Sequence, residues 1–411
     1  MMIRKLLILG VLFLLLENAH AQSLDSLFHL AVENNLELKA LQLEYEAELQ
    51  KVDQVSQLPD PTLGVGVPLL RPETRLGPQV MMISASQMFP WFGTFKAKED
   101  VVLSMSKAKY ERIAAQRLEL FNKLKIAYYK LQFLEEKGKI IEDNILQFEA
   151  LKSVATSMVE GGSASIANVL RIQLKIDDLK QSLKKLSNSK KQFYAEINAV
   201  TFQPWETEIT PEKSDLSAAL VFDLEAFRTK IQTHYPLILK LDWEIEVSQN
   251  QQLVNQNMGA PKFGIGMDYS IVSERTDMNP EFNGRDILVP KIAFSIPLYR
   301  KSYKAKHQEE VLKQSALEYQ KEALETHILS LLIQFKAEYE NALIDIELNN
   351  GQIETTRSVY QILLSNYSTS GRGFDELLQI QNQFLNYQLK VKNAEMMALI
   401  AKANIDKYTD Y

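Results

Sequence analysis

The stretch that decides the fold runs from Pro261 to Ile271 and has the sequence PKFGIGMDYSI. After the proline, large apolar residues alternate with glycine, serine or charged residues. This period of two predicts a β-strand with one apolar face and one small or polar face. The same arrangement follows Pro61, where Leu63 and Val65 alternate with glycines. Because proline ends a helix, each strand is expected to begin directly after a helical segment.

Around these two strands, the chain divides into two similar halves. We predict a first repeat over residues 22–201, an inter-repeat segment over residues 202–222 and a second repeat over residues 223–411. Near the ends of the two halves, VLRIQ at 169–173 corresponds to LLQIQ at 377–381. Two copies are too few for a solenoid, so a duplicated unit is the better interpretation.

Each repeat contains a predicted β-hairpin, at about residues 62–89 and 262–297. Strands of about 9–11 residues match the length needed to cross a bilayer at a tilt. One apolar and one small or polar face is typical of a lipid-facing barrel with a wet interior. A soluble sandwich, in which the same alternation faces an ordinary core, is the alternative.

Aromatic residues gather at the base of the predicted strands, where an interfacial girdle is expected. The candidates for this girdle are Phe89, Trp91, Phe92, Tyr299 and Tyr303.

A long helical stretch follows each hairpin, over residues 94–157 and 301–366. Apolar residues recur every seven positions in both, which predicts left-handed coiled coils. A helix of about 60 residues is about 90 Å long. Each long helix meets a turn rich in glycine and serine, at 161–163 and 370–373, and a second helix returns. The result is two antiparallel helical hairpins.

The first 21 residues are predicted to be a signal peptide. Arg4 and Lys5 precede an apolar run over residues 6–16, and Ala19-His20-Ala21 matches a cleavage pattern. An uncleaved anchor helix is the alternative, but the run is shorter than the roughly 20 residues that span a bilayer. The mature chain is therefore expected to begin at Gln22.

Composition argues against several functional classes. The net charge of −6 does not favour nucleic acid as a partner, and there is no cysteine for disulfides. The five histidines are scattered, and no glycine-rich phosphate loop follows a strand. We therefore expect no catalysis, no cofactor and no metal site. Met81, Met82 and Met88 suggest a soft-metal site, but packing within a strand is favoured.

Four strands cannot close a membrane barrel, since the smallest such barrels have about eight. The chain is therefore expected to share its strands with copies of itself, because the edges of a lone sheet are prone to association.

Three segments carry a resemblance to a known family: Leu58–Pro61 (LPDP), 86–93 (SQMFPWFG) and 367–373 (YSTSGRG). With the duplicated helix–hairpin–helix order, the whole mature chain resembles the TolC-type outer-membrane efflux channels, the outer membrane factors. The resemblance implies a mainly α fold with a β-barrel portion. Three copies form a 12-stranded outer-membrane barrel, continued by a long α-helical barrel in the periplasm.

The resemblance also implies a function and partners. The chain is expected to be a homotrimeric channel in the cell outer membrane, working with a periplasmic adaptor and an inner-membrane pump. Its LPDP and FPWFG segments are most similar to the branch serving heavy-metal pumps of the resistance–nodulation–division class. The cargo is expected to be small molecules or metal cations. The alternatives are an exit duct for type I protein secretion, or a coiled-coil adhesin or periplasmic scaffold without a pore.

In the family, an arginine and acidic residues near the second helical turn close the channel at its periplasmic tip. Aligned on Tyr367, the arginine falls on Arg372 and the first acidic residue on Glu376. The second acidic position carries Gln379, and Asp375 is a possible substitute. The alternative is a routine exposed pair at helix spacing, which contributes little.

Overall fold

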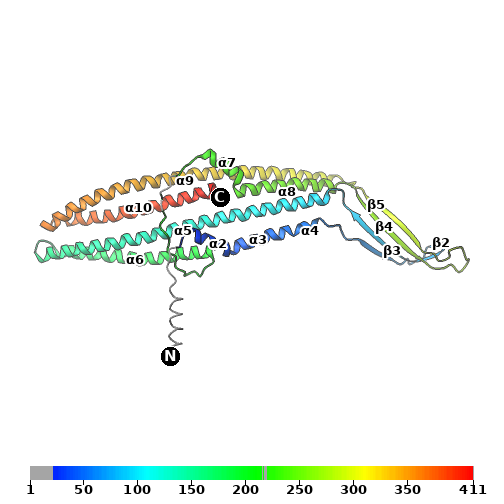
Figure 1. Ribbon diagram of the computed structural model, residues 1–411, viewed down its shortest axis with the longest axis horizontal. Coiled ribbons are helices and arrows are strands. Elements are labelled where there is room, and N and C mark those ends of the chain that lie inside the picture. Colours follow the sequence, from blue (N-terminus) through cyan, green and yellow to red (C-terminus); the bar gives the residue numbers. More distant parts are fainter. Residues whose placement is uncertain (1–21, 215, 217–219, 411) are drawn as a thin grey trace, which may run out of the picture. The chain divides into compact units, whose positions relative to one another are not determined.

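The computed structural model describes residues 22–214, 216 and 220–410 (Figure 1). The predicted signal peptide, residues 1–21, lies outside the described residues. The chain divides into two compact units. The strand-bearing unit comprises Ala40–Ile113 and Pro236–Leu324, and the helical unit comprises residues up to Lys39 together with Ala114–Tyr235 and Glu325–Tyr411.

The strand-bearing unit contains an antiparallel sheet in the order β1-β3-β4-β5. A short strand, β2, pairs with the start of β3. The strands are β1 (Thr62–Gly66), β2 (Glu73–Thr74), β3 (Gly77–Phe89), β4 (Lys262–Val272) and β5 (Ile287–Ser295).

The register places residues of the same kind beside one another across the sheet. Ile83 pairs with both Val65 and Tyr269, and Tyr269 pairs with Leu288. Partners in an antiparallel pair share a face, so the alternation within each strand extends over four strands.

The expected strand length of about 9–11 residues holds for β4 and β5 but is wrong for β1 and β3. β1 has 5 residues and β3 has 13. Pro68 follows closely after β1 and has no N–H to donate, and β1 has a partner on one side only. β3 is longer because its first two residues pair with β2 and the residues from Gln79 to Phe89 pair with β4.

Helices make up most of the chain, as the predicted fold class requires. Short helices precede each hairpin: α2 (Leu24–Asn34), α3 (Leu36–Leu49) and α4 (Lys51–Val55) in the first half, α7 (Leu224–His234) and α8 (Pro236–Met258) in the second. The long helices are α5 (Thr94–Glu160) and α9 (Lys301–Ser370), and the returning helices are α6 (Ile166–Thr201) and α10 (Phe374–Thr409).

The core of the helical unit lies between α5, α6, α9 and α10. It consists of apolar side chains at heptad spacing, including Phe148, Ile172 and Tyr367, none of which is exposed. A second cluster joins α2 to α5 and α6 around Leu124, Leu131 and Ile197. The seven-residue rows predicted from the sequence therefore form real packing surfaces.

Candidate functional site

The apolar face of the sheet is exposed to solvent in the single chain. Leu63 is 76% exposed, Ile265 57% and Ile292 73%. These side chains share one face in the register, together with Val65, Met267, Leu288 and Phe294. A soluble sandwich would bury such a face, so the exposure argues against that alternative. The face requires a covering that this chain does not supply.

The opposite face of the sheet is built from small and polar residues. Gly64 and Ser84 pair across β1 and β3, and a Cβ on Gly64 would lie 2.6 Å from the Ser84 hydroxyl. A Cβ on Gly264 would lie 2.4 Å from the Met88 sulfur. The glycines therefore allow neighbouring side chains to lie flat on the sheet. Met82 and Met88 lie on this face, whereas Met81 pairs with Ile271 on the other.

Charged residues on the small and polar face form an ion pair between strands. Lys291 of β5 contacts Asp268 of β4, whose side chain is 13% exposed. Lys262 lies on the same face at the start of β4 and is exposed. The face thus carries two lysines and one aspartate among glycine, serine and alanine, together with Met82, Met88 and Val289. Its charged and small residues are compatible with a water-filled space.

Among the described residues, both edges of the sheet are open, because β1 and β5 are its terminal strands. An open edge presents backbone N–H and C=O groups without partners and is a template for strand addition. The edges and the exposed apolar face both indicate assembly with further strands.

Three of the five girdle candidates lie together at the base of β3 and β4. The Phe89 ring stacks on Phe263 at 5.3 Å, and Phe92 lies 5.7 Å from Phe263 and 5.8 Å from Trp91. Trp91 begins a turn in which its carbonyl accepts from the Thr94 hydroxyl at 2.7 Å. The sequence did not identify Phe263 as a girdle residue, although its position opposite Phe89 follows once β3 and β4 are paired.

The other two girdle candidates precede or begin α9. Tyr299 is 88% exposed. The Tyr303 ring covers Gly259, where an added Cβ would lie 3.3 Å from it.

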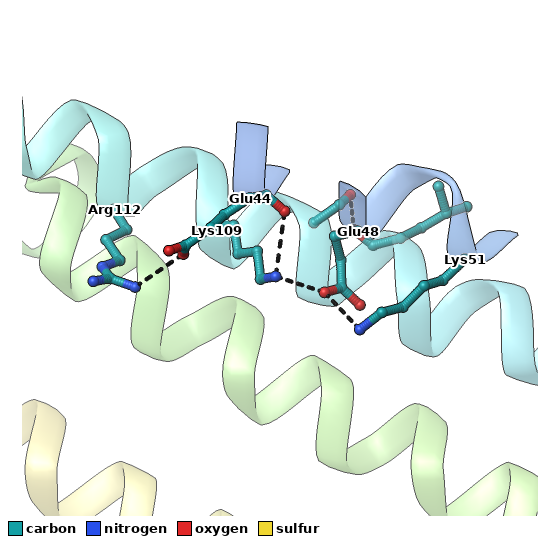
Figure 2. A network of polar contacts seen from close by, with 7 residues as sticks. Glu44, Glu48, Lys51, Lys109 and Arg112 are labelled. Atoms are coloured by element: carbon teal, nitrogen blue, oxygen red, sulfur yellow. Dashed lines mark hydrogen bonds and ion pairs between the residues drawn. The ribbon is translucent and has the colours of Figure 1, made fainter. Parts of the chain in front are cut away.

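An ion-pair network fixes α3 and α4 to α5 within the strand-bearing unit (Figure 2). The Glu48 carboxylate is 6% exposed and lies 2.7 Å from Lys109 Nζ and 3.0 Å from Lys51 Nζ. Lys109 also donates to the Glu44 carbonyl, and Arg112 lies 3.4 Å from the Glu44 carboxylate. Burial acts to raise the pKa of Glu48, but the two lysines outweigh it and hold the pKa below its ordinary value. Glu48 is therefore ionised at neutral pH.

The helical tip, residues 160–173 and 367–380, contains all four gate candidates. Arg372, Asp375, Glu376 and Gln379 are all exposed. Asp375, Glu376 and Gln379 lie in the first turns of α10, whereas Arg372 precedes the helix N-cap, Gly373. In the described part of this single chain, Arg372 and Glu376 form no ion pair with each other or with another residue. Asp375 instead contacts Arg171 of α6.

Arg171 is a residue of the helical tip that sequence reasoning missed. Its guanidinium also lies 5.5 Å from the centre of the Phe374 ring. The internal repeat carries the signal that could have identified it, since Arg171 in VLRIQ corresponds to Gln379 in LLQIQ. The duplicated position holds a cation in one half and a neutral amide in the other.

The two turns of the helical tip pack closely against each other. Gly371 has a φ of 70°, and a Cβ there would lie 2.1 Å from the Ser163 carbonyl oxygen. Asn168 donates to the Tyr367 hydroxyl at 3.3 Å, and the Tyr367 ring lies 5.6 Å from Phe374. The gate candidates therefore project from a rigid, packed base.

Within residues 22–214, 216 and 220–410, no group of three or more histidine or acidic side chains could hold a metal ion. In the same residues, no helix is both long and apolar enough to cross a membrane.

Comparison with known proteins places this geometry in context. Residues 27–201 match the model of the outer membrane efflux protein family. No curated protein matches the sequence. The fold is similar to that of the outer-membrane channel OprN, with a TM-score of 0.75 and 15% identity, over 94% of this chain and 89% of that one.

Two further solved structures have the same fold. The outer membrane protein VceC from Vibrio cholerae matches with a TM-score of 0.71 and 12% identity, over 94% of this chain and 95% of that one. The open state of the MtrE outer membrane channel from Neisseria gonorrhoeae matches with a TM-score of 0.70 and 15% identity, over 94% and 88% of the two chains.

Proposed function

We propose that this chain, whose residues 27–201 match the outer membrane efflux protein family, serves as a passive exit channel of a tripartite efflux system. Three copies join edge to edge, β5 of one beside β1 of the next, and close a 12-stranded barrel in the outer membrane. The long helices continue it as a periplasmic duct. The apolar face of the sheet then contacts lipid, and the small and polar face lines the water-filled interior.

The exposed apolar face carries this proposal. A chain that folded for water would not leave Leu63, Ile265 and Ile292 exposed on one side of a sheet while its other side stays small and polar. A coiled-coil adhesin or periplasmic scaffold has no use for such a face.

Partners follow from the passive nature of the duct. No residue described above performs catalysis in this proposal, so the energy for export comes from an inner-membrane pump, joined through a periplasmic adaptor. We assign the pump to the resistance–nodulation–division class and the cargo to small molecules or metal cations. The LPDP and FPWFG segments support this assignment.

The helical tip supplies the gate of the proposed duct. Three copies of Glu376 around a constriction would repel one another unless cations pair with them. Arg372 is free in the single chain to pair with Glu376 of a neighbouring copy, whereas Asp375 is already held by Arg171. Such pairs close the duct, and their loss opens it.

Cell fractionation and gel mobility test whether the strands form the proposed trimeric barrel. We expect the protein in the outer membrane, as a trimer that resists detergent at room temperature and dissociates on heating. Purified trimers in lipid vesicles should release small trapped solutes. A monomer in the soluble periplasmic fraction would end the proposal.

A further inference from the structure

The first described residue, Gln22, is bound into the helical unit by both of its backbone groups. Its N–H donates to the Thr210 carbonyl at 2.9 Å, and it forms a parallel bridge with Pro211. Its carbonyl accepts a hydrogen bond of 2.8 Å from the Tyr128 hydroxyl. Tyr128 is 1% exposed and accepts in turn from the Glu212 N–H at 2.6 Å. Gln22 thus has a defined binding position.

The side-chain carbonyl oxygen of Gln22, by contrast, is buried and has no hydrogen-bond donor among the residues that the structure describes. A buried acceptor without a donor destabilises the folded state. Gln22 also directly follows the Ala19-His20-Ala21 pattern, so the predicted cleavage makes it the first residue of the mature chain.

A free amino terminus at this position would be unfavourable. An α-amino group has a pKa of about 7.7–8.0 and is mostly charged at neutral pH. Helix α2 begins at Leu24, with Ser23 as its N-cap. A cation directly before a helix N-terminus is repelled by the helix dipole. The contacts of Gln22 require one N–H donor and one carbonyl acceptor at its backbone, and neither requires a charge.

We propose that Gln22 is a modification site and that the mature chain begins with pyroglutamate. After cleavage, the free α-amino nitrogen attacks the side-chain Cδ of the same residue. The N–Cδ bond forms, the Cδ–Nε2 bond breaks, and ammonia leaves with one proton from the amine. No oxidant, reductant or second substrate is needed. The lactam keeps one N–H for Thr210 and loses the charge.

The neighbouring contacts suit this product. The Tyr128 hydroxyl still donates to the carbonyl of the first residue, and burial raises the pKa of the Tyr128 phenol, so it keeps its proton. The blocked terminus is then held against α5 and the 210–212 segment, where an aminopeptidase cannot easily reach it. This proposal does not depend on conduction by the channel.

Intact-protein mass spectrometry tests the proposal on the full-length protein, purified from outer membranes of cells quenched in acid at harvest. We expect a chain that begins at residue 22 and is lighter than the open form by one ammonia molecule. The control is Gln22→Asn, whose shorter side chain would close only a strained ring, so that its mature chain keeps the full mass. A chain with an open Gln22, one that keeps earlier residues, or a ring that forms only on storage would overturn the proposal.

Digestion with a pyroglutamyl peptidase tests the binding position separately. The folded trimer should release its first residue much more slowly than the denatured chain. Tyr128→Phe, which removes the donor to the carbonyl of residue 22, should speed release from the folded protein without changing the mass of the terminus. Equal release from folded and denatured wild-type protein, or no effect of Tyr128→Phe, would overturn the docked terminus.

Discussion

The sheet and the helical unit differ in which residues they bury within one chain. In the helical unit, the apolar side chains of Phe148, Ile172 and Tyr367 are fully buried. In the sheet, Ile265 and Ile292 are exposed, while Gly264 and Asp268 on the other face are buried. The helical unit therefore has its own hydrophobic core, and the sheet does not. The stability of the sheet depends on what surrounds it.

The difference shows what stabilises each region. Burial of apolar surface inside the chain stabilises the helices in water. The apolar face of the sheet can be removed from water only by lipid, and the backbone groups at its edges can be paired only by further strands. Substitutions in the two regions should therefore respond differently to the membrane.

Removal of a core side chain from the helical unit should have the largest effect. Phe148→Ala leaves a cavity among α5, α6 and their neighbours, and should lower the free energy of unfolding by about 3–5 kcal/mol. Urea denaturation followed by far-ultraviolet circular dichroism measures this loss. Glu142→Ala, at an exposed position of the same helix, should change it by less than about 0.5 kcal/mol. Equal losses for the two variants would contradict the assigned core.

A charge on the apolar face of the sheet should have the next largest effect, and only in the membrane. Ile292→Lys should destabilise the inserted barrel by about 2–4 kcal/mol if the residue lies near the bilayer midplane. The heat-modifiable trimer in outer membranes should be depleted accordingly. Ala293→Lys, one position along β5 but on the opposite face, should retain the trimer. A similar loss of trimer in both variants would mean that the two faces of the sheet do not contact lipid and water, respectively.

The shielded carboxylate of Glu48 should contribute less and should do so in a pH-dependent way. Glu48→Gln should lower the free energy of unfolding by about 1 kcal/mol at pH 7, near the upper end for surface ion pairs, because the carboxylate is shielded while its lysine partners are more exposed. The pKa of Glu48 is lowered in the folded state from its ordinary 4.5. Its stabilising effect is therefore present above pH 4.5 and is lost as pH falls through the folded-state pKa.

Denaturation at several pH values checks this expectation, and the difference between wild type and Glu48→Gln should disappear in acid. Glu46→Gln, whose carboxylate accepts from Gln42 at 3.0 Å on the helix surface, is the control and should show little change at any pH. A constant difference across the pH range would indicate a packing effect instead of an ionic one.

The exposed charges of the helical tip should have the smallest energetic effect, but a visible one on conduction. The double variant Arg372→Ser, Glu376→Ala removes pairs that are worth at most about 1 kcal/mol each, which corresponds to a shift of up to about fivefold per pair in the equilibrium between closed and open states. We expect larger single-channel conductance in planar bilayers. Lys180→Ser, which breaks the exposed pair with Glu149, should leave conductance unchanged. An unchanged conductance of the double variant would show that Arg372 and Glu376 do not form the gate.

Local periodicity explains why much of the architecture could be predicted. The alternation after Pro61 and Pro261 places strands, and the heptad row through Ile141 and Phe148 places a long helix, because each depends on neighbours in the chain. The shortness of β1 was missed, since the loss of pairing after Gly66 depends on Pro68 and on an open edge.

The contacts of the candidate site were harder to predict, because they join distant positions. Asp375 and Arg171 are 204 residues apart, and Phe263 meets Phe89 only through the register of β3 and β4. Spacing along the chain placed Arg372 four residues before Glu376, but did not show that Arg372 precedes the helix N-cap or that Asp375 is paired elsewhere.

By itself, the sequence determined the repeat, the strands, the long coiled-coil helices and the need for further copies, because periodicity and strand count are local or additive properties. The tertiary structure alone decided which residues pair across the strands, which acidic residue of the helical tip is already paired, and that Gln22 has a binding position. Those outcomes depend on close packing between segments far apart in the chain, and no local sequence pattern encodes such packing.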